Sequence, residues 1–140
     1  MQKLIWTCAV ASCLAVLSAN AQVATPAADP ALAQFKAARD KIAADYKADR
    51  TACDAMKDNA KDICIEEAKG KEKVAKAELD QQMKPGNANA RKVAEAKVEA
   101  AYSVAKEKCD DQKGDAKSAC MKQAKADQDK GKADVKAMKK

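Results

Sequence analysis

Four cysteines constrain the fold of this chain more than any other feature of its sequence. They form two pairs with the same internal spacing of eleven positions, Cys53 with Cys64 and Cys109 with Cys120. Sliding the chain by 56 residues, from Cys53 to Cys109, superposes both pairs. The same shift aligns other identical residues: Lys41 with Lys97, Tyr46 with Tyr102, Asp54 with Asp110, Lys57 with Lys113, and the Ala-Lys steps at Ala60, Ala68, Ala116 and Ala124. The sequence therefore contains an internal duplication.

The midpoint of each cysteine pair carries residues that end one helix and begin another. These are Asp58-Asn59 in the first copy and Gly114-Asp115 in the second. Eleven residues of unbroken helix separate two Cα atoms by about 16 Å, whereas a disulfide tolerates about 4.4 to 6.8 Å. Gly or Asp can end a helix, and Asn59 or Asp115 can cap the next one by accepting its free amide protons. We therefore expect a helical hairpin in each copy, with one disulfide across its base.

The cysteines could instead form bridges between two chains or bind a metal. Eleven residues are close to three helical turns, so a continuous helix would place both sulfurs on one face, where they could bridge two chains. Structural zinc sites bring cysteines in closer pairs, of the Cys-x2-Cys or Cys-x4-Cys kind, and this chain has no His. We therefore expect structural disulfides, leave bridges between chains open, and expect no metal and no cofactor.

The apolar pattern and the composition both favour helices. Steps of three and four connect a stripe over the first arm of copy one, formed by Leu32, Phe35, Ile42, Tyr46, Cys53 and Met56. Ala dominates the apolar residues, so the chain can build only a thin core. It is interleaved with Lys and Glu, and all three residue types are strong helix formers. Closing a loop of about twelve residues with a disulfide contributes roughly 3 kcal/mol. The predicted fold is all-α, with two tandem disulfide-clasped helical hairpins.

Composition and helix-breaking residues divide the chain into five segments. We expect a signal peptide over 1–21, a disordered linker over 22–30 and the first hairpin repeat over 31–83. A second linker over 84–89 contains Pro85 and Gly86, which stop a helix. The second hairpin repeat follows over 90–138, with a frayed basic tail after Lys130.

The first 21 residues have the three parts of a cleavable secretory signal. Lys3 precedes an apolar run from Leu4 to Leu17, and the small residues Ala19 and Ala21 precede the predicted cleavage point. Cleavage there sends the product to the periplasm or beyond and removes Cys8 and Cys13. The alternative is a lipoprotein with lipid on Cys13, which is disfavoured because it would leave a very short signal and strand an apolar run after the lipid. Export and structural disulfides support one another, because such bonds persist in oxidising compartments.

Several functional classes lack their sequence signatures. The chain has no His, no Cys-x-x-Cys pair and no glycine-rich phosphate loop, so we expect no enzyme and no catalytic residue. Its 27 Lys and Arg alternate with 21 Asp and Glu, and aromatic residues for base stacking are nearly absent, which argues against specific nucleic-acid binding. An envelope protein, an anionic polymer or a membrane surface is the expected partner. The oligomeric state stays open.

The repeated runs 46–69 and 102–125 carry a signature of Tyr, Cys, Gly-Asn/Asp-Ala-Lys, Cys and Ala-Lys. In this signature the chain resembles a group of small exported Ala/Lys-rich proteins of Gram-negative bacteria, often labelled TolA-like cell-envelope proteins. Asp58 stands in copy one where the pattern has Gly. The resemblance implies a place in the envelope and brings no known catalytic residue.

Together these features predict an exported, non-enzymatic structural or interaction protein of the bacterial cell envelope. The alternative is a periplasmic stress-protective module, either chaperone-like or binding polyanions. A thiol or metal sensor ranks third.

Overall fold

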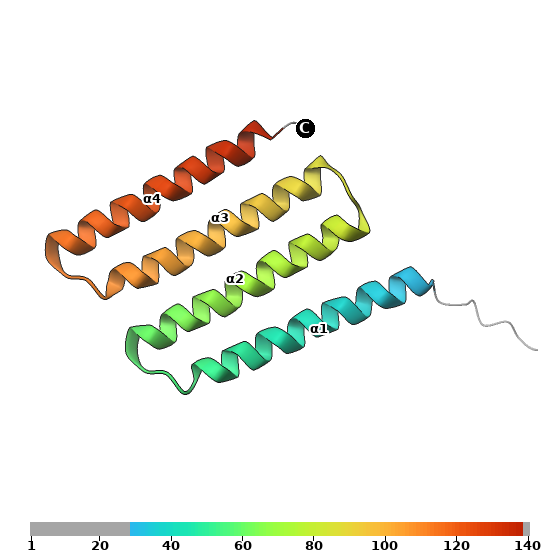
Figure 1. Ribbon diagram of the computed structural model, residues 1–140, viewed down its shortest axis with the longest axis horizontal. Coiled ribbons are helices and arrows are strands. Elements are labelled where there is room, and N and C mark those ends of the chain that lie inside the picture. Colours follow the sequence, from blue (N-terminus) through green and yellow to red (C-terminus); the bar gives the residue numbers. More distant parts are fainter. Residues whose placement is uncertain (1–28, 139–140) are drawn as a thin grey trace, which may run out of the picture.

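A computed structural model of the protein describes residues 29–138, which form four long helices. Their bounds are Pro30–Cys53 for α1, Asp58–Met83 for α2, Asn87–Asp110 for α3 and Gly114–Ala137 for α4. The helices run antiparallel in chain order, with the two cysteine loops at one end and the 84–86 loop at the other (Figure 1). The predicted all-α class with two disulfide-clasped hairpins is confirmed. The predicted signal peptide, its cleavage residues Ala19 and Ala21, and residues 22–28 lie outside the described part.

The four helices form a single layer. Each described helix contacts only the helix before and after it in the chain, and the contact between α2 and α3 is the most extensive. Figure 1 shows this as four ribbons lying side by side. Most domains bury apolar residues between two packed layers. Here burial is confined to the three seams between helices, and both broad faces of the layer stay open.

Small residues dominate the buried positions in these seams. The buried apolar residues of the described part are Cys53, Ala68, Ala96, Cys109, Ala124 and Val135. Of the predicted stripe only Cys53 is among them. Phe35, Ile42 and Tyr46 are half-buried, whereas Leu32 is 61% exposed and Met56 is 45% exposed. Leu32 lies in the first turn of α1, and Met56 lies in the loop after it, so neither faces α2 across a full seam. For these two residues the stripe prediction was wrong.

Each disulfide closes its own hairpin. Cys53 bonds to Cys64 with their Cα atoms 5.6 Å apart, and Cys109 bonds to Cys120 with a Cα separation of 5.5 Å. Pairing within the hairpins is therefore confirmed, and the alternative of bridges between chains is contradicted. The first helix ends at Cys53 itself, which is earlier than the predicted break at Asp58.

The capping roles predicted for Asn59 and Asp115 were wrong. The residues at the N-cap positions of α2 and α4 are Lys57 and Lys113, and neither helix has a side-chain cap hydrogen bond. Each N-cap lies two residues earlier than predicted, so Asn59 and Asp115 lie inside the first turn. Asn59 instead donates from Nδ2 to the backbone oxygen of Glu107 at 2.7 Å, which links the first hairpin to α3.

The residues after these N-caps adopt the left-handed backbone conformation. Asp58 has φ 50° and Gly114 has φ 57°, at equivalent positions of the two repeats. Asp tolerates this region better than most residues with a Cβ, and Gly adopts it without steric cost. The break residues thus do turn the chain, through their backbone conformation.

Replacing Gly114 by alanine should destabilise the protein by about 1 kcal/mol, because a Cβ disfavours positive φ. Nothing lies within 4 Å of the position that Cβ would occupy, so the effect isolates the backbone. Gly86→Ala is the matched control: it has equally open surroundings, and its φ of 163° is extended. Urea unfolding measures both, and equal losses at the two positions would contradict the assignment.

Three helix ends differ from the predicted boundaries. Asp29 caps α1 by accepting a hydrogen bond from the backbone nitrogen of Ala31 at 3.0 Å, so helix begins inside the predicted 22–30 linker. The α3 helix begins at Asn87, inside the predicted 84–89 linker. The tail after Lys130 was predicted to fray, but α4 continues to Ala137 and Val135 is buried. A buried apolar residue near the end of α4 explains why the last turns stay helical.

Candidate interaction surface

The backbones of α2 and α3 approach closely at Gly70. A Cβ added at this glycine would lie 2.8 Å from the Cβ of Ala100, which is closer than real Cβ atoms come. Gly70 is buried although it lies in a helix interior, where Gly costs about 1 kcal/mol relative to Ala. The close approach accounts for Gly at this position and draws the two hairpins together.

A groove of about 590 Å³ runs along this seam on one face of the layer. We call it the α2–α3 groove. Its floor consists of small and medium apolar residues: Gly70, Val74, Ala100, Ala101, Val104 and Ala105. Its rim consists of four charged residues: Glu67, Lys71, Lys97 and Lys108. The groove is therefore apolar at its base and mainly cationic at its edges.

Each rim lysine forms a surface ion pair. Lys97 lies 2.8 Å from Glu78, Lys71 lies 3.2 Å from Asp49, and Lys108 lies 3.7 Å from Glu67. All six side chains are largely exposed, and such surface pairs typically contribute about 0 to 1 kcal/mol each. The lysines can therefore exchange these partners for other carboxylates at little cost.

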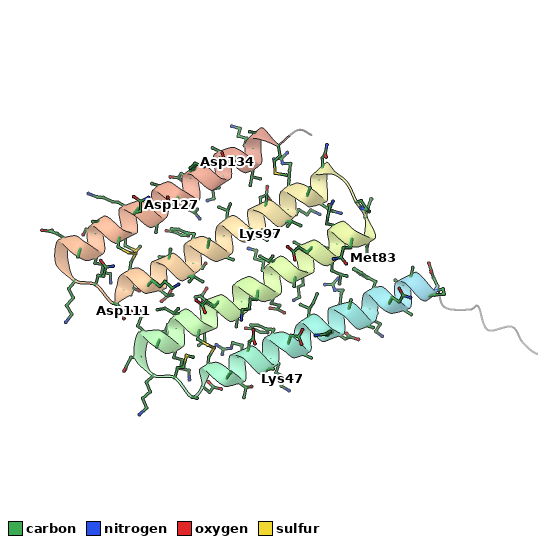
Figure 2. The ribbon with its side chains drawn as sticks, viewed as in Figure 1. Lys47, Met83, Lys97, Asp111, Asp127 and Asp134 are labelled. Carbon is green, nitrogen blue, oxygen red and sulfur yellow. A yellow bond between two sulfur atoms is a disulfide. The ribbon has the colours of Figure 1, made fainter. Side chains whose placement is uncertain are left out.

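Two further hollows adjoin the groove on the same face. One lies between α1 and α2, has a volume of about 240 Å³ and shares Lys71 with the groove. The other lies between α3 and α4, has a volume of about 410 Å³ and shares Lys97, Ala101 and Ala105. Carboxylates line both: Asp45, Asp49 and Glu72 line the first and Asp127 lines the second. Figure 2 labels Lys97 on α3 and Asp127 on the neighbouring α4. The face thus has a cationic centre with acidic residues on either side.

The opposite face of the same seam has a different character. A hollow of about 310 Å³ there is lined by Lys69, Lys73, Glu99 and Ser103, among others. The side chains of residues two positions apart on a helix differ in direction by about 200° around the helix axis. Lys69 and Lys73 therefore lie on the face opposite to Lys71, and Ser103 lies on the face opposite to Ala101. An ion pair joins Lys73 to Glu99 across this face. The two faces can therefore be tested separately by substitution.

The two valines of the groove floor, Val74 and Val104, have no valine equivalent in the terminal helices. The repeat shift of 56 residues takes Val74 of α2 to Lys130 of α4, and it takes Val104 of α3 to Ala48 of α1. The outer edges of the layer thus carry a charged or smaller residue where the inner seam carries valine. Repeat proteins end their arrays in this way, with polar outer faces on the terminal units. The groove is a product of joining the two hairpins.

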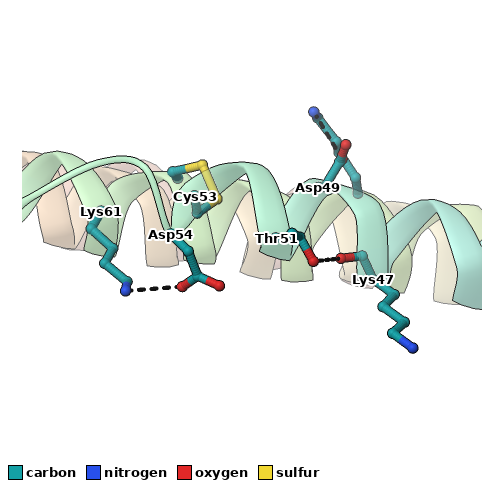
Figure 3. The surroundings of a disulfide bond; sticks show 8 residues. Lys47, Asp49, Thr51, Cys53, Asp54 and Lys61 are labelled. Atoms are coloured by element: carbon teal, nitrogen blue, oxygen red, sulfur yellow. Dashed lines mark hydrogen bonds and ion pairs between the residues drawn. A yellow bond between two sulfur atoms is a disulfide. The ribbon is translucent and has the colours of Figure 1, made fainter.

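The first disulfide lies beside an ion pair that closes the same loop (Figure 3). Lys61 on α2 lies 2.9 Å from the Oδ1 of Asp54, which follows Cys53. Lys117 and Asp110 form the equivalent pair at 2.9 Å in the second repeat. The pKa of the Asp54 carboxyl lies below its usual value because the Lys61 side chain donates a hydrogen bond to it and places a positive charge beside it. The loop thus has a covalent and an ionic closure.

Replacing Lys61 by methionine should raise the pKa of Asp54 towards its ordinary value, as measured by carboxyl-carbon NMR titration. A depressed pKa contributes stability above the unfolded-state pKa and loses it as pH falls through the folded-state pKa. The stability difference between the native protein and Lys61→Met should therefore be present at neutral pH and vanish in acid. Lys57→Met, in the same loop, is the control; an equal shift of the Asp54 titration in both variants would contradict the pairing.

All four cysteines predicted as site residues form the two disulfides, and none of them lines the α2–α3 groove. The groove itself was not predicted. Gly70 was the one available signal, because a glycine in the middle of a strongly helical segment marks a close approach.

Within residues 29–138, no helix is long and apolar enough to cross a bilayer, and no cluster of three or more potential metal ligands of the His, Cys, Asp and Glu kind occurs. No protein-family model, curated protein or solved structure matches the chain.

Proposed function

We propose that this protein is an exported, non-enzymatic interaction module of the bacterial cell envelope, and that the face carrying the α2–α3 groove is its binding surface. The observation that carries the proposal is the single-layer arrangement, which leaves this face uncovered by any other described helix. An apolar floor with a charged rim is typical of surfaces that recognise another molecule.

The clasps support the exported location. Two disulfides hold the hairpins, and structural disulfides are typical of exported proteins and rare in the cytosol. The signal-like features of residues 1–21 support export, and the resemblance of the cysteine repeats to TolA-like envelope proteins supports a place in the cell envelope. A rigid pair of hairpins also presents a surface that loses little entropy on binding.

In-cell photo-crosslinking tests the binding surface. A photoreactive amino acid replaces Ala101 on the groove floor in one variant and Ser103 on the opposite face in the other. Discrete crosslinked products are expected from position 101 and not from position 103. No product from either position, or the same products from both, would contradict the proposal.

The chaperone-like alternative has one observation in its favour, the continuity of the apolar hollows across one face. Such a surface could hold unfolded clients without selecting one. Light scattering of several unrelated aggregating proteins separates the two functions. Protection of all of them at equimolar amounts would favour the alternative, whereas no protection is expected from a selective interaction module.

A further inference from the structure

We infer that the α2–α3 groove binds an amphipathic helix of a partner protein, whose narrow apolar stripe is flanked by Asp and Glu. The inference rests on the proposed function, because it names the partner class for the same surface. It is carried by the shape of the floor and by the sign of charge on the rim.

The floor fits a third helix lying along the seam. Gly70, Ala100 and Ala101 have little or no side chain, so an incoming helix can approach the backbones of α2 and α3. Helices that pack through small residues lie about 8 to 10 Å apart, and an amphipathic helix in a groove is a common mode of peptide recognition. Val74 and Val104 give such a helix apolar contacts along the same line.

The rim selects a partner with negative flanks. Lys71, Lys97 and Lys108 line the groove, against Glu67 as its one lining carboxylate. Asp49 and Glu78, which pair with two of these lysines, do not line the groove. The positive charges therefore border the floor more closely than the compensating negative charges do, and partner carboxylates beside an apolar stripe would meet them.

The same charges disfavour two other occupants. A second copy stacked face to face about a twofold axis would bring one lysine rim against another, and like charges across an interface are costly. A flat anionic membrane would cover the flanking hollows as well and would meet Asp45, Asp49 and Asp127 there. A helix of about 10 Å diameter can stay within the groove and avoid these carboxylates.

Fluorescence anisotropy with synthetic peptides tests the inference on the protein as purified from the periplasm, with its disulfides intact. The probe is a labelled peptide of about 18 residues, which forms about five helical turns. It carries a stripe of Ala and Leu flanked by Glu. The comparison peptide has Lys in place of every Glu. At least about tenfold tighter binding of the Glu peptide is expected, with weakening as salt screens the rim. Equal binding of both peptides, or stronger binding of the Lys peptide, would overturn the inference.

Matched variants locate the binding. Lys97→Glu with Lys108→Glu should weaken the Glu peptide at least about tenfold, because it reverses two rim charges. Lys69→Glu with Lys73→Glu breaks two ion pairs on the opposite face, makes the same charge change and should leave binding within about twofold. Circular dichroism checks that both pairs of variants keep their helices. Equal losses in the two would show that the peptide is bound elsewhere.

A second pair of variants avoids charge altogether. Ala101→Gln fills the floor with a longer neutral side chain and should reduce affinity about tenfold, whereas Ser103→Gln on the opposite face should not. Vesicles of phosphatidylglycerol and sedimentation of the free protein test the other occupants. Vesicle binding that Ala101→Gln abolishes would show that the groove binds a membrane. A dimer that the same substitution disrupts would show that the groove binds a second copy. Either result would overturn the inference of a partner helix. Crosslinking at position 101 combined with failure of the Glu peptide would overturn this inference and leave the proposed function standing.

Discussion

Reduction of both disulfides is expected to lower the melting temperature by at least about 20 °C and to remove most of the helical circular dichroism at 37 °C. Each bond closes a loop of about twelve residues, which contributes roughly 3 kcal/mol, so the two together supply about 6 kcal/mol. Small domains have a total stability of about 5 to 15 kcal/mol, and 1 kcal/mol shifts the melting temperature by about 4 to 8 °C. The small buried residues of the single layer leave little to compensate.

Cysteine variants supply the control for this experiment. A protein with Cys53, Cys64, Cys109 and Cys120 all replaced by alanine should melt close to the reduced native protein and should not respond to reductant. Removing one clasp at a time should cost about half of the total, roughly 3 kcal/mol for each hairpin. A melting temperature that does not move on reduction would show that the helix seams alone stabilise the fold.

Gly70→Leu is expected to destabilise the protein by about 2 to 3 kcal/mol and to separate the two hairpins. A Cβ alone would lie 2.8 Å from the Cβ of Ala100, and both atoms are fixed to helix backbones, so α2 and α3 must move apart. Overpacking of this kind costs about 1 to 3 kcal/mol or more, which outweighs the gain of up to about 1 kcal/mol in helix propensity. Because α2 and α3 join the hairpins, thermal unfolding should change from one transition to two.

Two comparisons make the Gly70 prediction specific. Gly86→Leu places the same side chain where nothing lies within 4 Å of the Cβ position, so it should change stability by less than about 1 kcal/mol. Exchanging the two small residues, Gly70→Ala with Ala100→Gly, keeps the total volume at the contact and should recover most of the loss of Gly70→Ala alone. An exchange no more stable than that single variant would mean that the contact does not set the distance between the helices.

The clasped hairpins could be predicted because a disulfide imposes a strict limit on distance. Eleven residues of continuous helix exceed that limit, so a bond from Cys53 to Cys64 requires a reversal of the chain between them. The duplication then repeats the same conclusion for Cys109 and Cys120. The side-chain caps at the turns were predicted incorrectly. Asp58 and Gly114 turn the chain by their backbone conformation, and Asn59 donates a hydrogen bond to Glu107 instead.

The arrangement of the hairpins could not be predicted in the same way. Whether α3 packs on α2 alone or also on α1 depends on which helix faces are complementary, and Ala-rich faces have weak preferences. Val74 and Val104 are ordinary apolar positions in a helical pattern until the seam brings them together with Gly70. The groove is therefore a tertiary feature, assembled from residues that lie far apart in the sequence and carry no shared motif.

The end of α4 shows how composition can mislead. The segment after Lys130 is rich in lysine, which favoured a frayed tail, yet Val135 is buried there. Val135 is the repeat equivalent of Leu79 in α2, so the duplication carried the correct signal. A single buried apolar residue, supported by an ion pair from Lys130 to Asp134, outweighs the solvating effect of its neighbours.

The intact mass of the protein recovered from the periplasm of a Gram-negative host tests the central claim most directly, that this is an exported chain held by two disulfides. We expect a chain that begins at Gln22 and is lighter by two hydrogens for each disulfide, with peptide mapping that joins Cys53 to Cys64 and Cys109 to Cys120. A chain that keeps residues 1–21 and free thiols in the cytoplasm would contradict it, and so would a lipid mass on Cys13.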